Sequence, residues 1–93
     1  MMSEYISVDV EYSDDPDLVR IVTNLRLAPS GAEYYVDRDA GDVGSPLAQT
    51  LFSIEGLSAL DIHDNYLTVR RDPDAEWYAL IDEITEALKD FFL

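Results

Sequence analysis

The chain has 93 residues, which suffices for one domain with a single hydrophobic core. Its 20 acidic and 6 basic residues give a net charge of −14. This charge argues against binding to nucleic acids or anionic membranes, because both need clustered Lys and Arg. The absence of cysteine excludes disulfides, thiolate nucleophiles and cysteine-bound zinc or iron–sulfur clusters within these residues.

The chain begins with two predicted strands. Residues 6–12 alternate apolar and polar side chains, a pattern typical of a half-buried strand with one solvated face. Residues 13–17 are rich in Asp and contain a proline, which indicates a turn. Residues 18–23 are rich in β-branched side chains and predict a second strand, which residues 25–28 extend past an irregularity.

A third strand and a loop complete the first half of the chain. The Pro-Ser-Gly sequence at residues 29–31 indicates a turn, and residues 32–36 predict the third strand. Residues 37–44 contain three acids and two glycines, so we expect an exposed loop there.

A short amphipathic helix is predicted to begin after Ser45. Serine is a favoured helix cap, and Pro46 is suited to the first helical position. Apolar side chains follow at helical spacing: Leu47, Leu51, Phe52 and Ile54. Gly56 suits a left-handed backbone conformation and is predicted to end this helix.

The best-specified local element is a hairpin that turns at Asp64 and Asn65. Both residue types tolerate positive φ, as a two-residue hairpin turn requires. The resulting register pairs His63 with Tyr66, Ile62 with Leu67, Asp61 with Thr68 and Leu60 with Val69. This register places the aliphatic pairs on one face and the polar pairs on the other, so the turn and the hydrophobic pattern agree.

The last predicted element is a long helix that opens at Asp72, Pro73 and Asp74, where acidic side chains favour the helix dipole. Its apolar stripe consists of Trp77, Leu80, Ile81, Ile84, Leu88 and Phe91. Phe92 and Leu93 are expected to be partly exposed. The element order is then β-β-β-α-β-β-α. We therefore expect an α+β two-layer sandwich over residues 1–93, with a largely antiparallel sheet covered by two helices.

Asp61 and His63 are the first candidates for a binding site. They lie two residues apart on one face of a strand, with Asp64 in the turn, and carboxylate and imidazole both bind Zn²⁺ or Fe²⁺. Such a site would be incomplete without a partner chain. The alternative interpretation is a solvated hairpin tip at which His63 packs on Tyr66.

Other chemistry has weaker support. Asp14, Asp15 and Asp17 suggest calcium, but the EF-hand spacing is absent and Pro16 interrupts the run, so a turn is the preferred interpretation. No nucleophile elbow, phosphate-binding glycine loop or Ser/His/Asp order is visible, and we expect no enzymatic activity.

Aromatic side chains are the remaining candidates. Trp77 is typical of interface anchors, yet its place at the head of an apolar stripe predicts burial in the core. Better candidates for exposed contact are Tyr34, Tyr35, Tyr78 and Phe92, although they do not converge on a recognisable patch.

Four short segments in the second half of the chain occur together in a fixed order: Ser-Pro-Leu-Ala-Gln at 45–49, Ile-Glu-Gly at 54–56, Tyr-Leu-Thr-Val at 66–69 and Asp-Ala-Glu-Trp at 74–77. With these segments the chain resembles the N-terminal domain of Nfu/NifU-type iron–sulfur scaffold proteins. The likeness is weaker before residue 45. Where the family typically has a Thr-Pro-Asn-Pro-Asn turn and a Lys-bearing strand, this chain has Ser-Asp-Asp-Pro-Asp and Arg20.

The resemblance implies an accessory role. In full-length members a second domain binds the cluster through paired Cys-x-x-Cys motifs, and the first domain assists interaction or delivery. Because this chain has no cysteine, no cluster-binding residue can be transferred to it. We expect a non-enzymatic protein-interaction domain in iron–sulfur cluster assembly or delivery, without a cofactor of its own. Its expected partners are cluster-assembly proteins or iron–sulfur clients.

Two alternatives remain open: a generic acidic protein-interaction module unrelated to iron, and a weak metal-binding protein that uses the Asp61/His63 hairpin. The acidity is consistent with attraction of basic partners, with solubility and with a saline environment. Because no secretory signal and no apolar stretch of about 20 residues is visible, we expect a cytoplasmic location.

Overall fold

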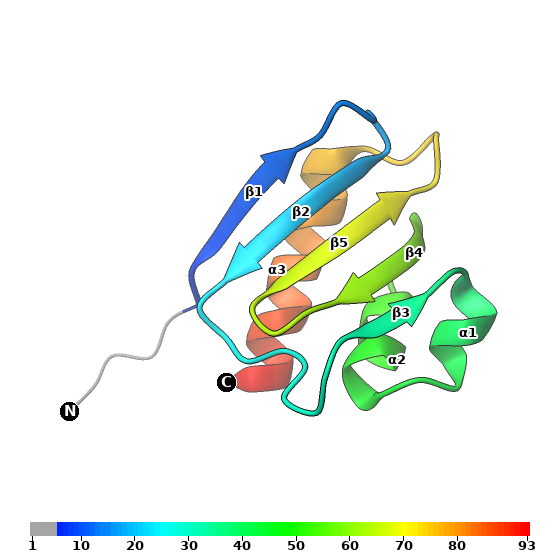
Figure 1. Cartoon of the computed structure of the whole chain (residues 1–93). Coiled ribbons are helices and arrows are strands. Elements are labelled where there is room, and N and C mark those ends of the chain that lie inside the picture. Colours follow the sequence, from blue (N-terminus) through cyan, green and yellow to red (C-terminus); the bar gives the residue numbers. More distant parts are fainter. Residues whose placement is uncertain (1–5) are drawn as a thin grey trace.

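Five antiparallel strands form one sheet in residues 6–93, the part of the chain that the computed structural model describes. The strands lie in the order β1-β2-β5-β4-β3, so β1 and β3 are its edges. Figure 1 shows α3 crossing behind this sheet, α2 behind its β3–β4 side, and no helix in front of it. The expected α+β architecture, with helices over one face of an antiparallel sheet, is confirmed.

The strands and helices follow the predicted order, with one additional helix. The strands are β1 (Val8–Tyr12), β2 (Leu18–Thr23), β3 (Glu33–Tyr35), β4 (Leu57–Ile62) and β5 (Tyr66–Arg71). The helices are α1 (Arg38–Asp42), α2 (Pro46–Phe52) and α3 (Trp77–Phe92). No helix within residues 6–93 is long and apolar enough to cross a bilayer.

The β4–β5 hairpin has the predicted register. Leu60 lies opposite Val69, Asp61 opposite Thr68 and Ile62 opposite Leu67. The His63 amide donates to the Tyr66 carbonyl at 2.9 Å, which closes the turn. The aliphatic members of these pairs are buried and face the helices.

The hairpin turn does not use the positive φ that we expected at Asp64 and Asn65. Among the described residues, positive φ occurs only at Gly31 and Gly56. The turn is instead fixed from outside, because its carbonyls accept hydrogen bonds from the chain that leaves β2. The Thr23 amide donates to the Asn65 carbonyl at 2.8 Å, and the Leu27 amide donates to the Asp64 carbonyl at 2.6 Å.

Helix α2 begins as predicted and ends earlier than predicted. The Ser45 hydroxyl accepts a hydrogen bond from the Ala48 amide at 3.2 Å, and Pro46 is the first helical residue. The helix ends at Phe52, because the next two amides bond three residues back, as in a tighter turn. Gly56 does adopt a left-handed backbone, with φ of +97°, but it leads into β4 and does not cap α2.

Helix α1 occupies part of the segment for which we expected a loop. The Asp37 carboxylate caps it by accepting from the Ala40 amide at 2.9 Å. The Arg38 guanidinium donates to the carbonyls of Phe52, Ile54 and Leu57. These contacts come from other elements, so a short sequence with little helix propensity is held helical by its surroundings.

The hydrophobic core fills the space between the sheet and helices α2 and α3. Helix α3 contributes its predicted stripe through Leu80, Ile84 and Leu88, which are buried. The last residue of the stripe was predicted incorrectly, because Phe91 is 42% exposed. Phe92 is half-buried and packs against the core, in agreement with the partial exposure expected for it.

Candidate functional site

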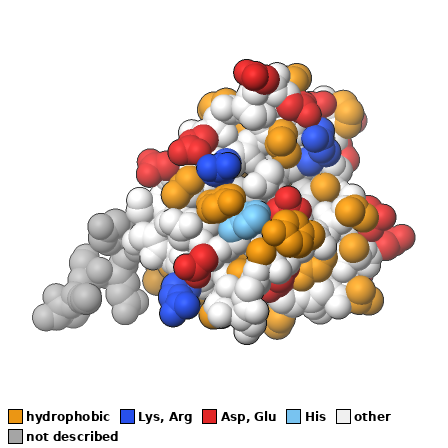
Figure 2. Space-filling model, viewed as in Figure 1, with side chains coloured by type: hydrophobic (Ala, Val, Ile, Leu, Met, Phe, Trp, Pro, Cys, Tyr) orange, Lys and Arg blue, Asp and Glu red, His pale blue; other side chains and the backbone are white. Residues whose placement is uncertain are grey.

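The uncovered face of the sheet, which we call the open face, presents side chains from every strand. They alternate along each strand with residues that pack in the core. The open-face residues used below are Glu11, Arg20, Tyr34, Asp61, Tyr66 and Thr68, with His63 at the end of β4. Figure 2 views this face, with the single histidine near its middle between hydrophobic side chains.

A row of stacked side chains, the aromatic row, crosses the open face. The Arg20 guanidinium carbon lies 4.6 Å from the centre of the Tyr66 ring. The other partner of this ring is His63, stacked at 4.3 Å between centroids with an interplanar angle of 14°. His63 in turn meets Tyr34 edge to face, at 5.7 Å and 81°. The row therefore joins β2, β5 and β3 through side chains alone.

His63 is a member of this row, as the hairpin-tip interpretation predicts. Its ring stacks on Tyr66, and Asp61 shares its face two residues earlier. Within residues 6–93, no group of three or more His, Cys, Asp or Glu side chains is placed to hold a metal ion. The described residues therefore do not complete the metal site suggested by Asp61 and His63.

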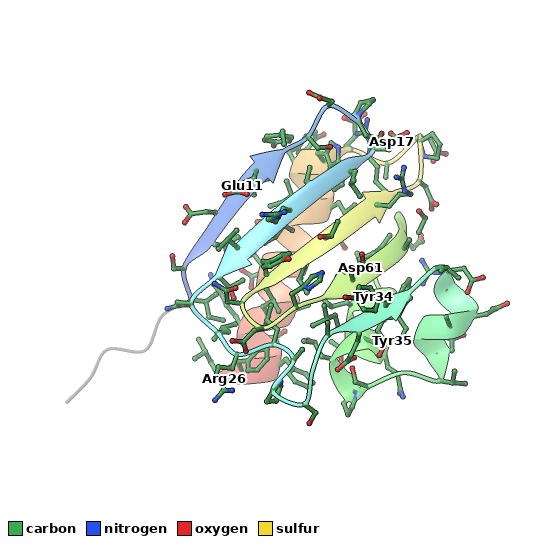
Figure 3. The ribbon with its side chains drawn as sticks, in the orientation of Figure 1. Glu11, Asp17, Arg26, Tyr34, Tyr35 and Asp61 are labelled. Carbon is green, nitrogen blue, oxygen red and sulfur yellow. The ribbon has the colours of Figure 1, made fainter. Side chains whose placement is uncertain are left out.

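Asp61 lies on the central part of the open face and has no charged partner among the residues that the structure describes. It is half-buried, opposite Thr68 on one side and Tyr34 on the other. Figure 3 shows Asp61 and Tyr34 projecting from neighbouring strands. No hydrogen bond or ion pair within the described part of the chain involves the Asp61 carboxylate.

All six basic side chains of the sequence lie in the described residues, and each is already engaged. Five form ion pairs: Arg20 with Glu11 at 3.8 Å, Arg26 with Asp64 at 3.7 Å, Arg70 with Asp15 at 3.1 Å, Arg71 with Asp17 at 3.0 Å and Lys89 with Glu86 at 3.5 Å. The sixth, Arg38, donates to backbone carbonyls. Asp61 thus has no free Lys or Arg side chain within residues 6–93 with which to pair.

Two shallow hollows lie beside the aromatic row. One, of about 260 Å³, is lined by residues that include Glu11 and Arg20. The other, of about 230 Å³, is lined by residues that include Ala59 and Asp61. Leu18 and Thr68 line both, so the two hollows are neighbours on the open face.

The turn between β1 and β2 is fixed to the end of β5 and the start of α3. Arg71 pairs with Asp17 at 3.0 Å, and the Trp77 indole N–H donates to the Pro16 carbonyl at 2.7 Å. The Asp17 backbone N–H donates to the Asp15 carboxylate at 2.9 Å, and this bond, helped by Arg70, lowers the pKa of Asp15. The carboxylates of Asp15 and Asp17 are thus used within the fold, as the turn interpretation predicts.

Trp77 is neither an exposed interface anchor nor fully buried in the core, the two alternatives considered from the sequence. It is half-buried, packs at the edge of the core and lies 5.2 Å from the Arg71 guanidinium. Its indole N–H is already bonded, so the side chain serves the fold rather than an open contact.

The four tyrosine and phenylalanine candidates for exposed contact lie in different environments. Tyr34 is 64% exposed and belongs to the aromatic row. Tyr35 is half-buried, with its hydroxyl bonded to Glu33 and to the Ser45 amide. Tyr78 is exposed on α3, and Phe92 packs against the core. The row is not predictable from the sequence, because Tyr34 reaches His63 only through the pairing of β3 with β4.

Comparison with known proteins gives a consistent result. The family described as "Scaffold protein Nfu/NifU N terminal" matches residues 8–93. A Drosophila persimilis protein named "NFU1 iron-sulfur cluster scaffold homolog, mitochondrial" is 25% identical over 85 residues, which cover 91% of this chain and 30% of that protein. The Drosophila ananassae protein of the same name is 24% identical over the same shares. The chain therefore spans about 30% of the length of these relatives.

Solved structures show the same fold. A NifU-like protein from Saccharomyces cerevisiae superposes with a TM-score of 0.75 at 21% identity, over 97% of this chain and 82% of that one. Protein SAV1430 from Staphylococcus aureus superposes with a TM-score of 0.69 at 14% identity, over 87% of this chain and 96% of that one. Because the family match extends over nearly all of the sequence, the chain belongs to the Nfu/NifU N-terminal domain family.

Proposed function

We propose that this domain is a non-enzymatic protein-contact module in iron–sulfur cluster assembly or delivery, and that it binds no cluster itself. The observation that carries the proposal is a family match over residues 8–93 in a sequence without a single cysteine. Iron–sulfur clusters are held mainly by cysteine thiolates, so another domain or protein must supply them. The cytoplasmic location expected from the sequence stays a prediction, and the named relatives are mitochondrial.

The open face supports a contact role. It is an uncovered sheet surface that combines an exposed aromatic side chain, shallow hollows and a carboxylate that has no partner among the described residues. Exposed aromatic groups beside polar ones are typical of surfaces that bind other proteins.

The first experiment tests cluster binding. The chain is incubated anaerobically with ferrous iron and sulfide, and a Cys-x-x-Cys domain of an Nfu protein serves as the positive control. We expect the visible absorption of an iron–sulfur cluster on the control alone. A stoichiometric cluster on this chain would overturn the proposal.

The second experiment tests contact. The cluster-loaded Cys-x-x-Cys domain is titrated into the isotope-labelled chain, and NMR shifts are followed. We expect saturable shifts that concentrate on one surface of the chain. If no shift changes at any ratio, the assembly role is wrong.

A second candidate is the generic acidic interaction module, which one surface feature favours. A groove of about 640 Å³ beside the start of α3 is lined by five acidic side chains, from Glu55, Asp72, Asp74, Glu76 and Glu83. Binding of basic proteins unrelated to iron, with strength that depends on total charge alone, would favour this candidate.

A further inference from the structure

The open face contains one complete arrangement for holding a guanidinium group. Arg20 lies over the Tyr66 ring, 4.6 Å from its centre, and its other partner is the Glu11 carboxylate at 3.8 Å. An aromatic face and a carboxylate together attract this cation, the first through the ring quadrupole and the second through its charge. The chain itself therefore shows how this surface binds an arginine.

A second arrangement of the same kind lies on the same face, without the arginine. Tyr34 and Asp61 are direct partners in the β3–β4 register, and directly opposed residues have Cβ atoms about 4.5–5.5 Å apart. Tyr34 meets His63 edge to face at 81°, so this contact does not stack a second ring on the Tyr34 ring. The Tyr66 ring differs, since Arg20 and His63 both lie against it.

The missing cation cannot come from the described part of the same chain. Its six basic side chains, which are all that the sequence contains, are engaged elsewhere. The net charge of −14 also draws basic segments toward the domain. Charge complementarity therefore points to a partner that brings its own arginine.

We propose that the open face binds a protein segment that presents an arginine, and that its guanidinium is held between the Asp61 carboxylate and the Tyr34 ring. The hollow beside Asp61, with Leu18 and Ala59 in its lining, accepts an apolar side chain next to this arginine. The inference rests on the proposed contact function and adds the surface and the chemistry of the partner.

The test uses two capped peptides as probes, Ac-Gly-Arg-Leu-Gly-NH₂ and the same peptide with citrulline, which keeps the shape of arginine without its charge. Each is titrated into the isotope-labelled chain, and NMR shifts yield the dissociation constant. We expect the arginine peptide to shift the signals of Tyr34, His63 and Thr68. The citrulline peptide should bind at least fivefold more weakly.

Variants then test whether the Asp61 carboxylate and the Tyr34 ring bind the arginine. Asp61→Asn should weaken binding of the arginine peptide at least fivefold, and Tyr34→Leu about threefold, on the scale of one cation–π contact. Asp82→Asn, which removes the same charge from an exposed position on α3, should change binding less than twofold. Dispersed spectra of all three variants show that the fold is intact.

Several results would overturn the proposal. Equal losses in Asp61→Asn and Asp82→Asn would mean that only total charge matters. Shifts confined to the acidic groove near Glu55 and Asp72 would place the cation elsewhere. Self-association of the chain that Asp61→Asn abolishes would make a second copy the occupant.

Binding of the Cys-x-x-Cys domain distinguishes a failure of the proposed assembly role from a failure of the proposed arginine site. If the Cys-x-x-Cys domain does not bind but the arginine peptide still distinguishes Asp61→Asn, the assembly role is wrong and the arginine site stands. If that domain binds the wild type and Asp61→Asn equally well, the assembly role stands and the arginine site is wrong.

Discussion

Replacing Gly41 by alanine sets two physical effects against each other. In an exposed helix interior, the change from glycine to alanine stabilises a protein by up to about 1 kcal/mol. In this fold, however, a Cβ atom on Gly41 would lie 2.0 Å from a ring carbon of Phe52. Phe52 is only 1% exposed, and Tyr35 and Arg38 lie against its ring, so the ring has little room to move.

The packing effect should dominate. Forcing an additional methyl group into a well-packed core costs about 1–3 kcal/mol, and this contact is short enough for the upper part of that range. After the gain in helix propensity, we expect Gly41→Ala to lower the free energy of unfolding by about 2 kcal/mol. For a domain of this size, the melting temperature should fall by about 8–16 °C.

Urea and thermal denaturation, followed by circular dichroism, measure the change. Val43→Ala is the matched control, because Val43 follows the same helix, is 86% exposed and should change stability by less than about 0.5 kcal/mol. A smaller ring-free side chain in Phe52→Leu should reduce the cost of Gly41→Ala, so the two changes should be non-additive. A Gly41→Ala protein as stable as the wild type, or more stable, would refute the packing argument.

Three further predictions concern the turn between β1 and β2 and the total charge. Trp77→Phe removes the donor to the Pro16 carbonyl and should lower the free energy of unfolding by about 0.5–1.5 kcal/mol in urea. Asp15→Asn should lower the melting temperature at pH 7. Folding lowers the pKa of Asp15, so its ionised carboxylate stabilises the folded state at pH values above the ordinary pKa of 3.8. For the wild type, the melting temperature should rise from low to about 0.1 M salt, because screening weakens repulsion within a chain of charge −14.

Each of these predictions has an outcome that contradicts it. An unchanged urea midpoint in Trp77→Phe would mean that the indole hydrogen bond adds no stability. For Asp15→Asn, the difference from wild type should close as the pH falls below 3.8 and the wild-type carboxylate takes up its proton. A difference that does not shrink at all as the pH falls below 3.8 would contradict the pKa argument. A melting temperature that falls with added salt would show that repulsion between the acidic side chains does not destabilise the folded state.

The elements that could be predicted are those that the local sequence determines. The hairpin is the best example, since its two-residue turn and its aliphatic alternation demand the same register, and that register is observed. The cap of α2 at Ser45 and Pro46 is another. In both cases the local sequence predicts the observed element, although the hairpin turn is also held by hydrogen bonds from the amides of Thr23 and Leu27.

The elements that were missed depend on distant contacts. Helix α1 contains Gly41, a poor helix former, and its fit depends on the buried Phe52 ring. Helix α2 ends before Gly56 in a tighter turn, and the carbonyls of Ile54 and Leu57 beyond it accept hydrogen bonds from Arg38, which lies in another helix. The aromatic row needs the β3–β4 pairing as well, and a single sequence does not reveal which strands become neighbours.

Strand β1 has a further consequence for the behaviour of the protein at high concentration. It is an edge of the sheet, and edge strands present backbone N–H and C=O groups to which a strand of another chain can pair. If a second copy added its own β1 antiparallel about Val10, Asp9 would meet Glu11 of that copy on both sides of the centre. Like charges directly opposed destabilise such a pair, so the acidic edge resists uncontrolled polymerisation.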